Sequence, residues 1–109
     1  MGYLRIICIA GMVAAAMPAF AQPDVTAQVQ AAEKQISSGD LPGAIAALEK
    51  IVAVAPRSFD ARLVLGRALD LQGSHPAART HFEEAVKLAS DEERNTALTS
   101  LGISYAFES

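Results

Sequence analysis

Residues 61–89 read ARLVLGRALDLQGSHPAARTHFEEAVKLA, and residues 27–55 read AQVQAAEKQISSGDLPGAIAALEKIVAVA. The two stretches align without a gap at an offset of 34 residues, which superimposes Gly39 on Gly73. A fixed period of about 20–50 residues is typical of repeat proteins, in which each unit buries its apolar face against its neighbours. This period therefore predicts a repeat architecture.

Within each unit the apolar residues recur at helical spacing. Ile45, Leu48 and Val52 in the first unit, and Phe82 and Ala85 in the second, are separated by three or four residues. No stretch alternates apolar and polar residues for long enough to predict a strand. We therefore expect five helices, over residues 24–37, 41–54, 59–71, 75–88 and 91–107.

Turn and cap residues follow the same period. Gly39 and Gly73 are expected to end helices, because glycine adopts a positive φ without steric cost. Asp40 and Ser74 follow them as N-caps whose side-chain oxygens accept first-turn amides. The same reasoning places Pro42 and Pro76 in the first turns of helices. It also predicts a capping box between Ser90 and Glu93.

Small residues recur at points where two helices must come close, because a bulky side chain there would push the pair apart. The sequence places Ala44, Gly66, Ala78 and Gly102 at such points.

The period and these residues together resemble the tetratricopeptide repeat family. The second unit carries the Leu-Gly and Ala-x3-Phe parts of its pattern, and a third partial unit contains Leu101-Gly102 and Tyr105. The resemblance implies an all-α fold, in which helix-turn-helix repeats form a short right-handed α-solenoid. The expected units are repeat 1 over residues 25–58, repeat 2 over 59–92, and a partial repeat or capping helix over 91–109.

The first 21 residues have the order of a secretory signal peptide. Arg5 supplies a positive charge, an apolar run covers residues 6–17, and a small-x-small cleavage sequence ends at Ala21. The run is too short to span a bilayer, which takes about 20 apolar residues. We therefore expect an exported protein, periplasmic or secreted, that consists of residues 22–109 and has no membrane span after cleavage.

The processed chain offers little chemistry. Its single cysteine, Cys8, lies in the signal segment, so neither a disulfide nor a thiolate metal ligand is expected. Residues 22–109 carry 8 Lys and Arg against 12 Asp and Glu, a net charge of −4 without a basic stripe, which argues against a nucleic acid partner. His75 and His81 are six residues apart and do not share a helix face. We expect no metal, no cofactor and no enzymatic activity.

In the family that this sequence resembles, the first helices of successive repeats line a concave groove that receives a peptide or a partner's helix. The resemblance therefore implies a protein or peptide as partner. Arg67 can bind a carboxylate of that partner in bidentate fashion, or it can pair with Glu33 inside the groove. The groove-facing candidates are Glu33, Leu63, Arg67, Asp70, Thr99 and Ile103, with Ala106 extending the row.

The last predicted helix is apolar on more than one face. Leu98, Leu101, Tyr105 and Phe107 are expected to form an open apolar edge through which the protein associates with itself or with a partner. The helix either caps the solenoid or belongs to the front part of a longer repeat array. Accordingly, the sequence predicts an exported protein-binding adaptor. The alternative is a non-catalytic N-terminal module or fragment of a larger envelope assembly factor or enzyme.

Overall fold

The computed structural model describes residues 24–108; the predicted signal segment, residues 1–21, lies outside them. Within the described part all regular structure is helical and no strand occurs. The five predicted helices are confirmed, with ends that differ by no more than one residue. They are α2 (Val25–Ser37), α3 (Leu41–Val54), α4 (Phe59–Gln72), α5 (His75–Leu88) and α6 (Asp91–Phe107).

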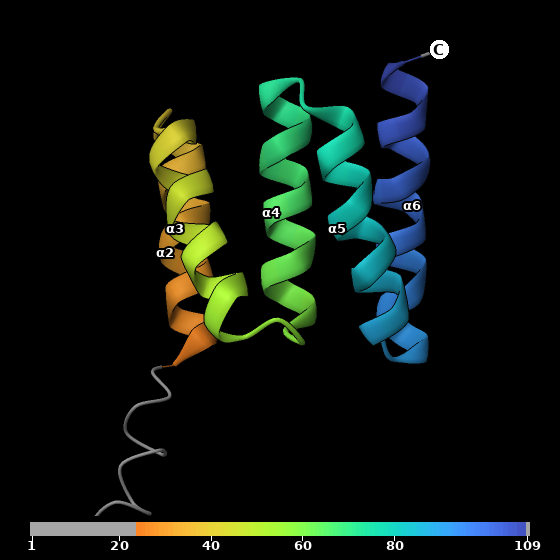
Figure 1. Cartoon of the computed structure of the whole chain (residues 1–109), viewed down its shortest axis with the longest axis horizontal. Coiled ribbons are helices and arrows are strands. Elements are labelled where there is room, and N and C mark those ends of the chain that lie inside the picture. Colours follow the sequence, from red (N-terminus) through yellow and green to blue (C-terminus); the bar gives the residue numbers. More distant parts are fainter. Residues whose placement is uncertain (1–23, 109) are drawn as a thin grey trace, which may run out of the picture.

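The helices stand side by side, and consecutive helices run in opposite directions (Figure 1). Helix α2 packs on α3, α4 packs on α5, and α6 packs on α5 at the C-terminal end of the stack. Helix α4 also contacts α2, α3 and α6, so it touches every other helix of the described chain. The predicted all-α fold of stacked helix-turn-helix units, an α-solenoid, is thus confirmed.

Local side-chain chemistry determines where the helices begin and end. Gly39 and Gly73 both have φ of 93°, as predicted for residues that follow a helix. The Asp40 carboxylate accepts a hydrogen bond from the Gly43 amide at 3.1 Å, which caps α3. The predicted capping box at the start of α6 is present, with both reciprocal hydrogen bonds between Ser90 and Glu93.

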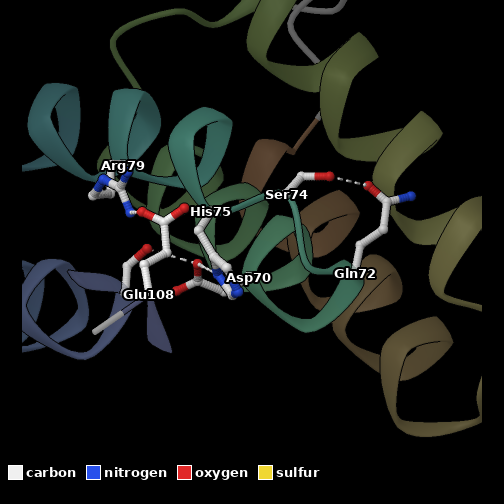
Figure 2. Close-up of polar contacts among 7 residues, drawn as sticks. Asp70, Gln72, Ser74, His75, Arg79 and Glu108 are labelled. Carbon is white, nitrogen blue, oxygen red and sulfur yellow. Dashed lines mark hydrogen bonds and ion pairs between the residues drawn. The ribbon is translucent and has the colours of Figure 1, made fainter. Parts of the chain in front are cut away.

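The predicted capping bond at Ser74 is wrong. Ser74 occupies the N-cap position of α5, but its side chain accepts no hydrogen bond from the first turn. Its hydroxyl donates instead to Gln72 Oε1 at 3.0 Å, across the turn between α4 and α5 (Figure 2). A hydroxyl rotates and can donate as well as accept, so a nearby amide oxygen competes with the backbone for it.

Helices α4 and α5 approach each other closely where Gly66 of α4 meets Phe82 of α5. Phe82 is 1% exposed, and a Cβ built on Gly66 would lie 2.5 Å from the nearest carbon of its ring. The corresponding residues of the first unit, 34 positions earlier, are Ala32 and Leu48, and both are buried. The second unit thus combines glycine with the large Phe82, and the first unit combines alanine with the smaller Leu48. This compensation in size keeps the interior close-packed.

Two of the expected small contact residues, Ala44 and Ala78, are fully buried. The expectation for Gly102 is wrong, because this glycine is exposed and a Cβ there would meet nothing within 4 Å. Among the described residues no helix packs on that side of α6, so the small residue has no close neighbour to accommodate.

Alanine at these two glycines should therefore act in opposite directions. We expect Gly66→Ala to destabilise the fold by about 1–3 kcal/mol, because the new methyl group overpacks the Phe82 ring. Gly102→Ala should stabilise dilute protein by up to about 1 kcal/mol, since alanine favours an exposed helix. Urea denaturation measures both values. Equal effects of the two variants would contradict the packing described here.

His81 of α5 contributes to the same helix interface. Its Nδ1 lies 3.1 Å from Arg62 Nη1 on α4. A guanidinium only donates, so Nδ1 is the acceptor and the ring is the neutral tautomer with its proton on Nε2. Burial, together with the positive charge of Arg62, lowers the pKa of His81 below its ordinary value of 6.5.

This lowered pKa predicts a pH dependence of stability. Above about pH 6.5 the ring is neutral in both states, so its contribution is fully present there. As pH falls below this value the unfolded chain binds the proton more readily, and stability declines until the folded-state pKa is reached. We expect His81→Gln to unfold with a shallower decline in urea midpoint between about pH 7.5 and 5. Parallel curves for the two proteins would refute this.

Candidate functional site

One face of the stack is a groove lined by α2, α4 and α6. Two small hollows, of about 190 and 210 Å³, lie between α2 and α4, and a larger one of about 580 Å³ lies between α4 and α6. Arg67 lines all three. Its position on the central helix therefore makes it the one side chain common to these hollows of the groove.

The structure places all six predicted groove residues around these hollows. Glu33 and Leu63 lie on the α2–α4 side, while Asp70, Thr99 and Ile103 lie on the α4–α6 side. Leu63 is buried, so it contributes to the wall and offers little surface to a ligand. Ala106, expected to extend the row, does not line the α4–α6 hollow. The binding role of these residues stays a prediction.

The α4–α6 hollow has an apolar interior and a polar rim. Phe82 comes from α5 behind the groove, and Leu71, Ile103 and Phe107 add apolar surface from α4 and α6. Leu71 and Phe107 are 66% and 61% exposed, so they are available to a ligand. The polar residues around them are Arg67, Asp70, Asn95, Thr96, Thr99 and Ser100.

The lining of this hollow shows how the third unit is aligned. The residues of α4 that face α2 are Asp60, Leu63, Val64, Arg67 and Leu71. The residues of α6 that face α4 lie 36 positions later in each case: Thr96, Thr99, Ser100, Ile103 and Phe107. The spacing between the second and third units is therefore two residues longer than the 34-residue spacing of the first two.

Arg67 and Glu33 line two hollows together but do not form an ion pair. Between residues 24 and 108 the ion pairs are those of His75, Arg79, Lys87 and Arg94, and Arg67 takes part in none of them. The guanidinium of Arg67, an exposed residue, is thus not committed to a carboxylate within the described chain. The predicted alternative of an Arg67–Glu33 ion pair inside the groove is therefore absent from residues 24–108.

Asp70, in contrast, is committed to structural contacts. Its side chain is only 8% exposed, and His75 Nδ1 lies 2.8 Å from its Oδ1 (Figure 2). Ser104 Oγ donates to the same oxygen at 2.7 Å. Because a carboxylate only accepts, His75 donates from Nδ1. One carboxylate therefore connects α4, α5 and α6 at the end of the groove.

The predicted apolar edge divides between two faces of α6. Phe107 stacks on His75, with ring centroids 5.2 Å apart, and lines the groove. The Tyr105 ring instead lies under the Arg79 guanidinium, 4.6 Å from its carbon. Leu98 is 47% exposed, and Leu101 is partly buried against the core. The four residues thus do not form one continuous surface.

Arg79 fixes the C-terminal end of α6. Its Nη1 lies 2.6 Å from Glu108 Oε1, and the two side chains form an ion pair (Figure 2). The Arg79 side chain is 16% exposed, so this pair is partly shielded from solvent. Helix α5 therefore holds α6 through Arg79 as well as through His75.

Sequence reasoning missed Leu71, Phe82, Asn95, Thr96 and Ser100 as lining residues, and it assigned Phe107 to the edge alone. For α6 the repeat spacing could have found these residues. Asp60, Val64 and Leu71 of α4 line the α2–α4 hollows, and the positions 36 residues later are Thr96, Ser100 and Phe107. Phe82 reaches the groove from the second helix of its repeat, which a search limited to first helices cannot find.

The described residues show neither of two other kinds of site. Within residues 24–108 no group of three or more His, Cys, Asp or Glu is placed to hold a metal ion. In the same range no helix is both long and apolar enough to cross a membrane.

Stacked antiparallel helix pairs with a groove along their first helices define a helical-repeat scaffold. Residues 29–93 match the family model described as tetratricopeptide repeat, which covers more than half of the chain. The protein therefore belongs to the tetratricopeptide repeat family. None of the curated proteins compared with the chain matches it. Repeats of this family mediate protein–protein interactions, and the fold is typically a non-catalytic scaffold.

The contribution of the Ser104–Asp70 hydrogen bond to stability can be tested directly. Ser104 is fully buried, so Ser104→Ala removes a hydrogen bond to a charged group and should destabilise the protein by about 1.5–3 kcal/mol. Thr99→Ala, at an exposed position of the same helix, should stay within about 0.5 kcal/mol of the parent protein. Urea denaturation compares the two; indistinguishable variants would show that the contact adds nothing.

Proposed function

We propose that this protein is an exported adaptor that binds a protein or peptide through the groove formed by α2, α4 and α6. The observation that carries the proposal is the α4–α6 hollow, whose apolar interior lies beside Arg67. Ligand sites commonly combine a mostly apolar surface with a few polar groups that fix orientation. The export part rests on the charged, apolar and small-residue order of residues 1–21.

The chemistry of the groove favours a particular kind of ligand segment. Leu71, Ile103 and Phe107 offer exposed apolar surface to a large apolar side chain. Arg67 has a guanidinium without an ion-pair partner in residues 24–108, which favours a carboxylate next to that side chain. The groove therefore suits an acidic segment with one aromatic or aliphatic anchor.

Asp70 has a different role in this proposal. Its carboxylate already accepts from His75 and Ser104, so it holds α6 at a fixed distance from α4. A ligand then meets a preformed groove, which lowers the conformational entropy lost on binding. No catalytic step is assigned to any of these residues.

Removing the positively charged side chain of Arg67 should weaken binding of the partner. We expect Arg67→Ala to bind it at least about tenfold more weakly, because arginines in interfaces often dominate the binding energy. Crosslinking with mass spectrometry in an envelope extract identifies the partner, and titration of that partner then compares the variants. Arg57→Ala, which removes an exposed arginine from the α3–α4 connection, is the matched control.

Two results would contradict the proposal. One is a partner that crosslinks outside α2, α4 and α6. The other is a partner whose affinity falls equally in the Arg67 and Arg57 variants, since a general loss of positive charge would then explain the effect.

A further inference from the structure

The outer face of α6 consists of Leu98, Leu101, Gly102 and Tyr105. These residues recur at spacings of three and four and therefore share one side of the helix. Leu98 and Tyr105 are 47% and 53% exposed, and Gly102 has open space above its Cα. This face is apolar and carries no helix within the described chain.

The same chain shows how such a face is covered. Thirty-six positions earlier, the corresponding face of α4 is formed by Arg62, Leu65, Gly66 and Leu69. Helix α5 runs antiparallel over it and places the Phe82 ring against Gly66. Leu65 and Leu69 are 1% and 7% exposed as a result. The outer face of α6 is thus the equivalent of a surface that an antiparallel helix with an aromatic side chain covers.

We propose that a second copy of this protein covers the outer face of α6 with its own α6, around a two-fold axis. Each copy carries both parts of the contact on one face: Gly102 leaves a depression, and Tyr105, one turn later, supplies an aromatic side chain. In an antiparallel pair, Tyr105 of each copy lies against Gly102 of the other, next to Leu98 and Leu101. A two-fold contact needs this kind of self-complementary surface.

Charge supports a second copy as the occupant. Residues 95–107 contain no Asp, Glu, Lys or Arg, although most of this stretch is exposed. Around a two-fold axis a surface meets itself, so a single charged residue near the axis would face its own copy and repel it. Helix α5, by comparison, exposes Glu83 and Lys87. The uncharged stretch removes this obstacle on α6, and the charge of Arg79 beside Tyr105 is balanced by its ion pair with Glu108.

The contact leaves the groove open. Thr99, Ile103 and Phe107 point into the α4–α6 hollow, on a different side of α6 from Leu98, Gly102 and Tyr105. The Arg79 guanidinium covers one side of the Tyr105 ring, and the ring is still half exposed. The exposed part of the ring can therefore pack against the second copy. The dimer would present two grooves.

Sedimentation velocity over a concentration series tests this proposal. We expect the purified protein to show a monomer–dimer equilibrium. Gly102→Leu fills the depression, and we expect it to raise the dissociation constant at least about tenfold. The same change places a good helix former at an exposed position without a neighbour within 4 Å, so the monomer stays folded. Circular dichroism of dilute protein verifies this.

Two further variants make the test specific. Tyr105→Ser should weaken the dimer as well, and it should add little in combination with Gly102→Leu because the two residues meet in one contact. Leu71→Ser removes a similarly exposed apolar side chain from the groove and should leave the dimer unchanged. None of these variants alters residues 1–23, so association through that segment would persist in all of them.

A monomer at every soluble concentration overturns the proposal. An oligomer that Gly102→Leu leaves intact also overturns it, because another surface would then hold the copies together. The Arg67→Ala variant should lose partner binding and keep the dimer. This result would show that ligand binding in the groove and dimerisation through α6 can fail independently.

Discussion

The packing of the Phe82 ring directly on the backbone of α4 at Gly66 is the contact on which the rest of the structure depends. Only the missing Cβ lets the ring come so close, and this approach sets how near α5 stands to α4. Helix α4 touches all the other described helices, so its distance from α5 also determines where α6 stands. The groove is therefore a consequence of a core contact made behind it.

The groove depends equally on a polar contact. Asp70, His75 and Ser104 come from three helices and meet at one carboxylate oxygen. Ser104 lies on α6 and Asp70 on α4, so this hydrogen bond joins the first helices of neighbouring units. Shape complementarity sets the spacing of α4 and α5, whereas directional hydrogen bonds set that of α4 and α6. Arg67 stays outside this network, and for that reason we propose it as the residue that binds the ligand.

The sequence predicted the helices well and the site less completely. Periodicity and caps depend on nearby residues, so Gly39, Asp40 and the Ser90–Glu93 box could be assigned before any tertiary contact was known. Ser74 and Gly102 could not, because a hydroxyl has several nearby partners and a glycine shows no sign of whether a helix covers it. Likewise, Arg67 and Glu33 occupy matching positions, yet only the three-dimensional structure shows that their side chains do not pair. Asp70 was expected to face a ligand, and its two partners come from α5 and α6.

The buried side chains of α6 are small: Ala97, Ser100 and Ser104. This helix consequently buries fewer large apolar side chains than α4, and its contacts with Asp70, His75 and Arg79 add to the packing of Leu101 against the core. A guest that bridges α4 and α6 would supply apolar contacts that the helix otherwise lacks. Occupancy of the groove and the order of the last helix are then thermodynamically linked, so that a guest tightens the very wall against which it binds.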